Sequence, residues 1–309
     1  MPNKSPKTPA DFISPLSING LNGRVMRLPA PRGKKREILL AYGQHSSLER
    51  WWGLALALNR YGAMTVPDLP GFGGMDSLYK IDKPATVDNL ADYLADYINA
   101  NYKKRKVTLM GMSLGFPIAT RMLQKHPEMI GRVDMLISVV GFCHHDDFVF
   151  PKRQQRFYKY ASRFMSLRYT SAFYQRVFAA PWFIRRAYRH SRVAKEKFEG
   201  KDEAELRETI EAETVLWKIN DIRTQMRTNY EMFTLDNTGQ RLDLPVWHVA
   251  VDKDRYFDNR SVAKHMRKVF SGFDMFTSHV ENHAPSIIGD MESAAAYLPD
   301  KLTKIINQN

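Results

Sequence analysis

A serine lies at the centre of a short segment with a glycine at each end, Gly111-Met112-Ser113-Leu114-Gly115. The apolar run Val107–Met110 precedes this segment and a helical pattern follows it, so a Gly-x-Ser-x-Gly arrangement stands between a predicted strand and a predicted helix. In such a tight turn the glycines let strand and helix approach closely. The strained backbone holds the serine hydroxyl at the amino end of the helix, where N–H groups favour negative charge. The spacing therefore predicts a nucleophile at Ser113, with an idle serine in a glycine-rich turn as the alternative.

A serine nucleophile needs a base to take its proton, and the base needs a carboxylate to orient it. His283 stands shortly after the last predicted strand, and Asp254 stands shortly after the strand before it. Ligand sites of open parallel sheets lie outside the carboxyl ends of the strands, so we expect Ser113, His283 and Asp254 to meet at that edge. Four other carboxylates remain alternatives for the acid: Asp146, Asp147, Asp252 and Asp258.

Several other residues have catalytic or metal-binding side chains but fit structural roles better. His248 lies inside an apolar strand and is interpreted as a core histidine, and His279 as a structural or surface residue of the last strand. Cys143 follows a strand and is expected to be buried. The run His144-His145-Asp146-Asp147 is interpreted as a hinge rather than a metal site, because adjacent side chains rarely point at one ion and no matching cluster stands elsewhere.

The elements that must position these residues alternate along the chain. Six apolar runs of strand length are predicted at Ile38–Tyr42, Met64–Pro67, Val107–Met110, Met135–Val140, Val246–Val251 and Met275–Val280. They lack polar alternation, which is typical of strands buried on both faces. Helical patterns occupy Ser47–Tyr61, Val87–Tyr102 behind the capping residue Thr86, Leu114–Lys125, Asn259–Phe270 and Asp290–Ile306. Strand–helix alternation predicts an α/β fold with parallel strands and right-handed crossovers.

The alternation is interrupted once, between Gly141 and Leu242, where no strand pattern is found. Apolar side chains recur there at helical spacing from Phe157 to Leu167, and helices are also predicted from Pro181 and over Glu203–Phe233. The sequence therefore predicts one core, residues 1–143 and 242–309, that carries an all-helical insertion at residues 144–241.

Two further segments complete a resemblance to a known family. The turn Asp68-Leu69-Pro70-Gly71-Phe72-Gly73 and the loop Leu40-Ala41-Tyr42-Gly43-Gln44, together with the serine segment, are similar to motifs of the α/β-hydrolase superfamily. Tyr42 stands where that family usually has histidine, and Val251 where it usually has glycine. The resemblance covers nearly the whole chain. It implies that the backbone N–H groups of Gln44 and Leu114 form an oxyanion hole, and that the insertion forms a cap over the serine.

The resemblance also implies acyl transfer to water without a cofactor. We expect a carboxylic-ester hydrolase or a lipase-like enzyme, because the aspartate nucleophile of the family's epoxide hydrolases and haloalkane dehalogenases is replaced by Ser113. Carbon–carbon bond hydrolases, thioesterases, amidases and acyltransferases use the same triad and remain alternatives. A catalytically silent protein that binds a ligand or a membrane is the alternative from another class.

The net charge of +13 is concentrated in one segment. Between Pro151 and Phe198 thirteen lysines and arginines stand against one acidic residue, Glu196, and a dozen aromatic residues are interleaved with them. Three roles are open for this segment: aromatic side chains that face the sheet below a solvated basic face, adhesion to anionic lipid, or recognition of an anionic substrate. Nucleic acid is not expected as a partner, because no nucleic-acid-binding module accompanies the charge.

The cysteine content, the length of the apolar runs and the N-terminal segment indicate in which cellular compartment the protein is expected. Cys143 is the single cysteine, so the chain forms no internal disulfide, and no run of about 18 apolar residues occurs. The N-terminus lacks the apolar region of a secretory signal. We expect a cytoplasmic protein, with peripheral contact to the inner membrane surface as an alternative. The oligomeric state is not predicted.

Overall fold

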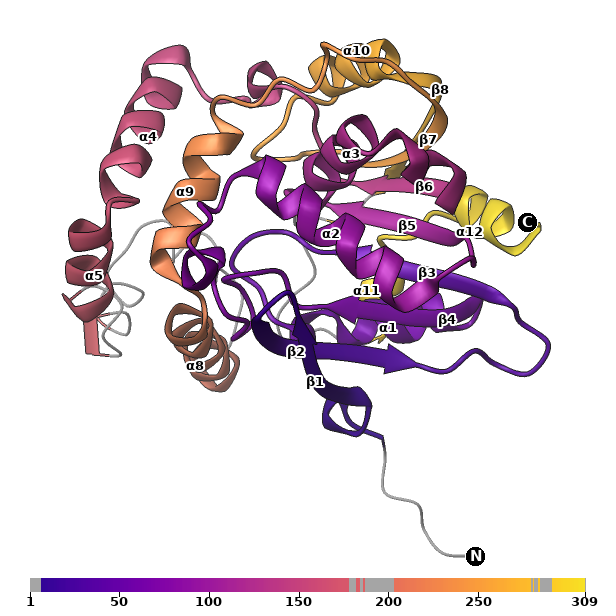
Figure 1. Ribbon diagram of the computed structural model, residues 1–309, viewed down its shortest axis with the longest axis horizontal. Coiled ribbons are helices and arrows are strands. Elements are labelled where there is room, and N and C mark those ends of the chain that lie inside the picture. Colours follow the sequence, from indigo (N-terminus) through magenta and orange to yellow (C-terminus); the bar gives the residue numbers. More distant parts are fainter. Residues whose placement is uncertain are drawn as a thin grey trace, which may run out of the picture.

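The computed structural model describes residues 7–177, 182, 183, 186, 203–278, 280, 283 and 291–308, and it shows one eight-stranded sheet with helices around it (Figure 1). The strands are β1 (Ile13–Ile18), β2 (Leu21–Leu28), β3 (Arg36–Ala41), β4 (Gly62–Pro67), β5 (Val107–Met112), β6 (Val133–Val139), β7 (Leu242–Val251) and β8 (Phe270–Ser278). Their order in the sheet is β1-β2-β4-β3-β5-β6-β7-β8. Strands β4, β3, β5, β6, β7 and β8 are mutually parallel, whereas β1 and β2 pair antiparallel. The predicted α/β-hydrolase fold class is confirmed.

The antiparallel hairpin β1–β2 is absent from the predicted elements. A two-residue turn joins its strands, and both Asn19 and Gly20 have positive φ angles, 51° and 79°. An Asn-Gly pair in this conformation is a strong hairpin signal, because its twist matches that of the flanking strands. Strand β1 contains Ser14, Pro15 and Ser17, so a criterion of uniformly apolar runs does not detect it even though the turn signal is present in the sequence.

The last strand differs most from its prediction. Of the segment expected at Met275–Val280, residues 275–278 belong to β8, which begins at Phe270 and ends at Ser278. Strand β8 pairs only with β7 among the described strands, and Met275 is 43% exposed. The expectation of burial on both faces is therefore wrong for this strand, which lies at the edge of the sheet and has exposed residues along its length.

The register of the central strands brings three chain segments to one place. Ala41 of β3 pairs with Gly111 of β5, and Met112 of β5 pairs with Val139 of β6. The backbone N–H of Ser113 continues this ladder and donates to the carbonyl of Val139 over 3.0 Å. The loops that follow β3, β5 and β6 therefore leave the sheet side by side at its carboxyl edge.

Helices cover both faces of the sheet. The α-helices of the core are α1 (Trp52–Asn59), α2 (Val87–Tyr102), α3 (Gly115–Lys125), α10 (Asn259–Val269), α11 (Met291–Ala295) and α12 (Asp300–Gln308). Short 3₁₀ helices are η1 (Pro9–Phe12), η2 (Leu48–Trp51), η3 (Leu78–Ile81), η4 (Pro127–Arg132) and η5 (His145–Asp147). Helices α2 and α3 pack together in front of the sheet, and α1 packs against α11 behind it (Figure 1). Among the described helices none has the length and apolar character required to span a bilayer.

Two predicted helix boundaries illustrate what the sequence can and cannot show. Thr86 caps α2 as predicted, since its hydroxyl accepts the N–H of Asn89 over 3.2 Å. The single closing helix expected over Asp290–Ile306 is wrong, because its described part forms α11 and α12 with a turn between them. Pro299 stands at the end of this turn, and a proline disfavours the helical conformation of the residue before it.

The described residues between β6 and β7 form helices joined by turns. These are η5, which contacts α10, and the helices α4 (Lys152–Met165), α5 (Arg168–Val177), α8 (Glu203–Ile219) and α9 (Ile222–Met232). The four α-helices gather beside the sheet, at the left in Figure 1. The helix predicted from Pro181 begins outside the described residues. The division into a core and a cap at residues 144 and 241 stays a prediction.

The continuous helix predicted over Glu203–Phe233 is broken between α8 and α9. Asp221 caps α9 by accepting the N–H of Thr224 over 2.8 Å. The break is held from outside the helices: Asn220 accepts the N–H of Gly73, and the N–H of Asp221 donates to the carbonyl of Gly71, each over 2.8 Å. These glycines belong to the loop after β4, so contacts that are remote in sequence end α8.

Candidate active site

The serine segment has the strained geometry that its spacing predicts. Ser113 has a φ of 48°, in the left-handed region that side chains rarely adopt. A Cβ atom on Gly115 would lie 1.9 Å from the carbonyl oxygen of Ala41, and one on Gly111 would lie 2.5 Å from the Cα of Phe116. Both flanking positions therefore require glycine, because the backbones of β3, β5 and α3 meet there.

The structure brings the three predicted catalytic residues together. The Oγ of Ser113 lies 3.0 Å from Nε2 of His283, and Nδ1 of His283 lies 2.7 Å from Oδ2 of Asp254. The side chain of Asp254 is 2% exposed and that of His283 12% exposed. A hydroxyl, an imidazole and a carboxylate thus form one hydrogen-bonded row, built from the loops after β5, β7 and β8.

The carboxylate of Asp254 is held in place from its other side. Its Oδ1 accepts the backbone N–H groups of Tyr256 and Phe257 over 2.8 and 3.2 Å. The rings of Tyr256 and Phe257 pack against the imidazole of His283, with centroids 4.9 and 5.4 Å away. The loop after β7 therefore fixes both the acid and the plane of the histidine ring.

The four alternative acids are engaged elsewhere or are exposed. Asp258 caps α10 and accepts the N–H groups of Arg260 and Ser261 over 2.8 Å each. Asp147 is buried against His265, with 2.5 Å between its Oδ1 and the ring Nδ1. Asp146 forms an ion pair with Lys152, and Asp252 is exposed.

The proposed oxyanion-hole residues lie on both sides of the serine. Leu114 follows Ser113 at the start of α3, and a Cβ atom on Gly43 would lie 3.0 Å from the Cβ of Ser113. Within the described part of the chain, the backbone N–H groups of Gln44 and Leu114 donate no hydrogen bond to another protein group. Leu114 thus follows Ser113 directly, Gln44 follows a glycine that lies beside Ser113, and their role as an oxyanion hole stays a prediction.

These observations agree with comparisons to known proteins. Residues 38–284 match the family defined by the alpha/beta hydrolase fold, a range that contains Ser113, Asp254 and His283. The chain belongs to the α/β-hydrolase fold family. Among solved structures it is similar to an esterase from Exiguobacterium antarcticum (TM-score 0.65, 14% identity, 94% of this chain and 97% of that chain). It is also similar to the enol-lactonase from Burkholderia xenovorans LB400 (TM-score 0.62, 12% identity, 96% of this chain and 100% of that chain).

One curated relative matches a part of the chain. The biotin biosynthesis bifunctional protein BioHC of Teredinibacter turnerae is 33% identical over 120 residues, which are 38% of this chain and 20% of that protein. The match therefore spans about a fifth of the length of the relative.

Contacts from the helical insertion hold the loop after β3, and sequence reasoning missed them. The side-chain amide of Gln44 donates to the carbonyl of Gln225 over 3.2 Å and to the hydroxyl of Thr228. His45, with a φ of 50°, has its Nε2 3.1 Å from Oε2 of the buried Glu213. Helices α8 and α9 thus set the position of the Gln44 backbone. No local pattern around Glu213 marked this contact.

Tyr42, which stands where the α/β-hydrolase fold usually has histidine, also stabilises the loop after β3. Its hydroxyl donates to Oδ1 of Asp68 over 2.8 Å and accepts the N–H of Leu69 over 3.1 Å. Both Tyr42 and Asp68 are fully buried, and burial raises the pKa of Asp68 to about 7 despite the nearby Arg24 guanidinium. The hydrogen bonds of Tyr42 with Asp68 and Leu69 therefore connect the loop after β3 to the turn after β4.

The structure confirms that His248 is a core histidine and that Cys143 is buried, as the sequence predicts. His248 is buried and its Nδ1 lies 2.9 Å from the hydroxyl of Ser138, and burial lowers its pKa to about 3, so it stays neutral. Cys143 is buried, and burial raises the pKa of its thiol well above the usual value. His279 lies outside the described residues.

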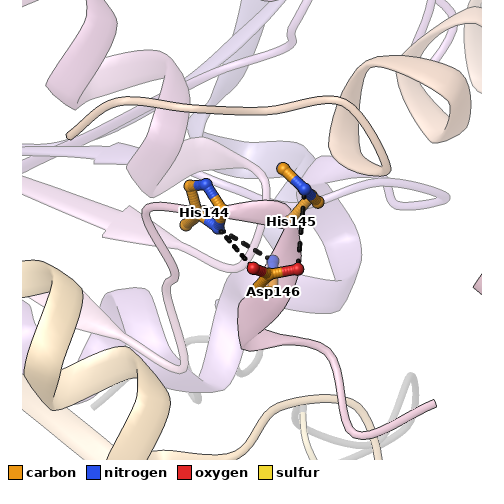
Figure 2. Close-up of side chains that lie close together, drawn as sticks. All are labelled: His144, His145 and Asp146. Carbon is orange, nitrogen blue, oxygen red and sulfur yellow. Dashed lines mark hydrogen bonds and ion pairs between the residues drawn. The ribbon is translucent and has the colours of Figure 1, made fainter. Parts of the chain in front are cut away.

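The histidine–aspartate run at the start of the insertion is more compact than expected. Figure 2 shows the side chains of His144, His145 and Asp146 turned toward one another, and their possible ligand atoms all lie within 4.8 Å. The expectation that adjacent side chains would diverge is therefore wrong. His144 Nδ1 accepts the N–H of Asp146 and His145 Nδ1 contacts the carbonyl of Leu235, each over 3.0 Å, and the role of this run as a hinge stays a prediction.

Proposed function

We propose that this α/β-hydrolase is a serine hydrolase that cleaves ester-like acyl substrates through a covalent acyl-enzyme intermediate. The observation that carries the proposal is the continuous row from Ser113 through His283 to Asp254, at 3.0 and 2.7 Å. A serine hydroxyl is a weak nucleophile at neutral pH, and a base at hydrogen-bonding distance activates it.

In the proposed first half-reaction the Oγ of Ser113 attacks the carbonyl carbon while Nε2 of His283 takes the hydroxyl proton. Asp254 stabilises the resulting imidazolium through Nδ1 and keeps the ring in the productive tautomer. When the tetrahedral intermediate collapses, His283 returns this proton to the leaving oxygen, and an alcohol departs. In the second half-reaction His283 activates water, which releases the carboxylic acid and restores Ser113.

The negative charge of the tetrahedral intermediate develops on the former carbonyl oxygen. We propose that the backbone N–H groups of Gln44 and Leu114 donate to that oxygen, since they flank the serine and are available in the described chain. Loss of one such donor costs about 3–4 kcal/mol of transition-state stabilisation in a comparable site. The contacts of Gln44 with α9 would keep this donor in place before the substrate binds.

An ester is the substrate class that we favour among those a Ser–His–Asp triad can attack. The similar solved structures include esterases and an enol-lactonase, and both activities cleave a carbon–oxygen bond of an acyl group. The triad supplies nucleophile, base and charge stabilisation from the protein alone, so the proposed reaction requires no cofactor or metal.

Activity-based labelling followed by a substrate series tests the proposal. The purified protein is treated with a fluorophosphonate probe and then assayed on p-nitrophenyl esters of graded chain length, with Ser113→Ala as the control. Labelling and hydrolysis that both disappear in the variant would support the assignment. Failure of the wild-type protein to react with the probe would indicate a catalytically silent member of the family.

A further inference from the structure

Helices α4 and α5 carry most of their aromatic side chains on the outside, whereas Tyr158 and Tyr174 are half-buried. Phe157, Tyr160 and Phe164 of α4 are 68%, 61% and 62% exposed, and Tyr169 of α5 is 85% exposed. The buried positions are polar instead: Gln155 and Ser162 in α4, and Ser171 in α5. The interpretation that the aromatic residues of this segment face the sheet is therefore wrong for these residues.

These exposed apolar residues form one stripe. Phe157, Tyr160, Phe164 and Leu167 recur at spacings of three and four, which places them along one side of a helix and its end. Leu167 is 53% exposed. A contiguous apolar surface of this kind is rare on a protein that has no partner for it, and it marks a site of interaction. We name the surface formed by these four residues the aromatic face.

Cationic side chains flank the aromatic face. Arg153 lies in the stripe, and Arg156, Lys159 and Arg163 form the adjacent row of α4. The chain has no aspartate or glutamate between Asp147 and Glu196. Among the described residues, no carboxylate forms an ion pair with any of these four cations. The face therefore offers positive charge and apolar rings together.

A cavity of about 440 Å³ opens beside the cationic row. Its lining residues are His145, Lys152, Gln155, Arg156, Lys159 and Phe233. Lys152, Arg156 and Lys159 place positive charge on its wall. Such a cavity suits the phosphate of a lipid headgroup.

We propose that the aromatic face docks on the surface of an anionic lipid bilayer. A bilayer interface matches both features at once, because aromatic rings lie at headgroup depth while lysines and arginines contact anionic headgroups. A polar acidic protein surface would pair with the cations but would leave the exposed phenylalanines in water, and the sequence contains no recognised nucleic-acid-binding module. The proposal does not depend on the proposed hydrolysis.

Helix α4 packs against α9, and α9 holds Gln44 beside the candidate nucleophile. The helices that touch the bilayer are therefore part of the same layer that contacts the proposed oxyanion loop. If the proposed function also holds, the bilayer would be the source of lipid-like esters.

Liposome co-sedimentation tests the docking directly. The full chain is mixed with phosphatidylglycerol vesicles or phosphatidylcholine vesicles at low and at high salt. We expect binding to phosphatidylglycerol only, weakened by salt because the Debye length shortens from about 30 Å at 0.01 M to about 3 Å at 1 M. Ser113→Ala should bind as the wild type does, which separates this test from that of the proposed hydrolysis.

Two variants and a matched control identify the face. A triple change of Arg153, Arg156 and Arg163 to Gln should weaken binding by about 100-fold, since each basic residue near an anionic surface contributes about 1 kcal/mol. A triple change of Phe157, Tyr160 and Phe164 to Gln should remove the binding that persists at high salt. The control changes the exposed Lys103, Lys104 and Lys106 to Gln, which removes the same net charge from the loop after α2.

Circular dichroism and thermal unfolding establish that each variant is folded before binding is compared. Undiminished binding of the control, with losses in both face variants, would support the proposal. Equal losses in the control and the arginine variant would overturn it, because net charge rather than the aromatic face would then explain binding. Absence of wild-type binding to phosphatidylglycerol at low salt would overturn it too, as would binding to a soluble polyanion alone.

Discussion

Replacement of Asp254 by asparagine should disable His283 as a base while leaving the fold intact. In the structure, Oδ1 of Asp254 accepts two backbone N–H groups and Oδ2 faces Nδ1 of His283. An asparagine amide has one oxygen, and the two N–H donors require it on their side. The NH₂ group then points at His283 and donates to Nδ1, so the ring proton moves to Nε2. A protonated Nε2 cannot take the proton of Ser113.

The size of the effect follows from the alternatives open to the asparagine variant. If the ring keeps its productive tautomer, an N–H of asparagine meets the N–H of His283 in a site where the native side chain is 2% exposed. Two buried donors without acceptors cost about 1–3 kcal/mol each. Turning the amide over would instead leave the N–H groups of Tyr256 and Phe257 without their acceptor, at a similar cost. The imidazolium also loses its charged partner. We expect kcat to fall by about 10⁴-fold, equivalent to about 5 kcal/mol.

The assay compares kcat and KM of Asp254→Asn and Asp252→Asn with the wild type on the best p-nitrophenyl ester. Asp252 is exposed and two residues away, so its change should lower kcat by less than about threefold. KM of both variants should stay near the wild-type value, because neither side chain is expected to bind substrate. More than a tenth of wild-type kcat in Asp254→Asn, or a larger loss in Asp252→Asn, would refute the reasoning and move the acid to another residue.

Four further outcomes follow from the geometry of Ser113 and from the buried Tyr42–Asp68 pair. Ser113→Ala should abolish probe labelling, and Ser113→Gly should unfold at a higher temperature than Ser113→Ala, because glycine relieves the cost of a φ of 48°. Equal melting temperatures of Ser113→Gly and Ser113→Ala would contradict the inference that the backbone at Ser113 is strained. Tyr42→Phe should destabilise the fold by about 1–3 kcal/mol in urea unfolding, since the buried Leu69 N–H and Asp68 lose a partner. Burial raises the pKa of Asp68 to about 7, so the folded protein binds a proton that the unfolded chain releases near pH 4. The stability of the wild type relative to Asp68→Asn should therefore fall as the pH rises from 5 to 8, and a constant difference between their urea midpoints would refute this.

The nucleophile was predictable because its geometry is local. Glycine is required at positions 111 and 115, because a Cβ atom there would lie as close as 1.9 Å to a backbone atom. Both positions fall within five consecutive residues, so a local pattern reveals the requirement. His283 and Asp254 could be placed from the alternation of strands and helices, since parallel strands deliver their following loops to one edge. Separating Asp254 from Asp258 required the structure, where Asp258 is occupied as the cap of α10.

Other features of the site depend on contacts that no local pattern contains. His45 meets Glu213 across 168 positions, and Gln44 reaches Thr228 across 184 positions. A polar residue on a helix matches many environments, so neither side chain is identified by its type or spacing. The break between α8 and α9 has the same origin, because the partners of Asn220 and Asp221 are the remote glycines Gly73 and Gly71.

By itself, the sequence determined the fold class, the serine segment and the helical character of α4. The periodicity of Phe157, Tyr160 and Phe164 showed that these rings share one side of a helix, but a helix with an apolar stripe and polar residues elsewhere can turn either side inward. Only the tertiary structure decided that Gln155 and Ser162 are buried and the rings exposed. The physical reason is that periodicity records which residues share a face, whereas burial is decided by the surface on which that face packs.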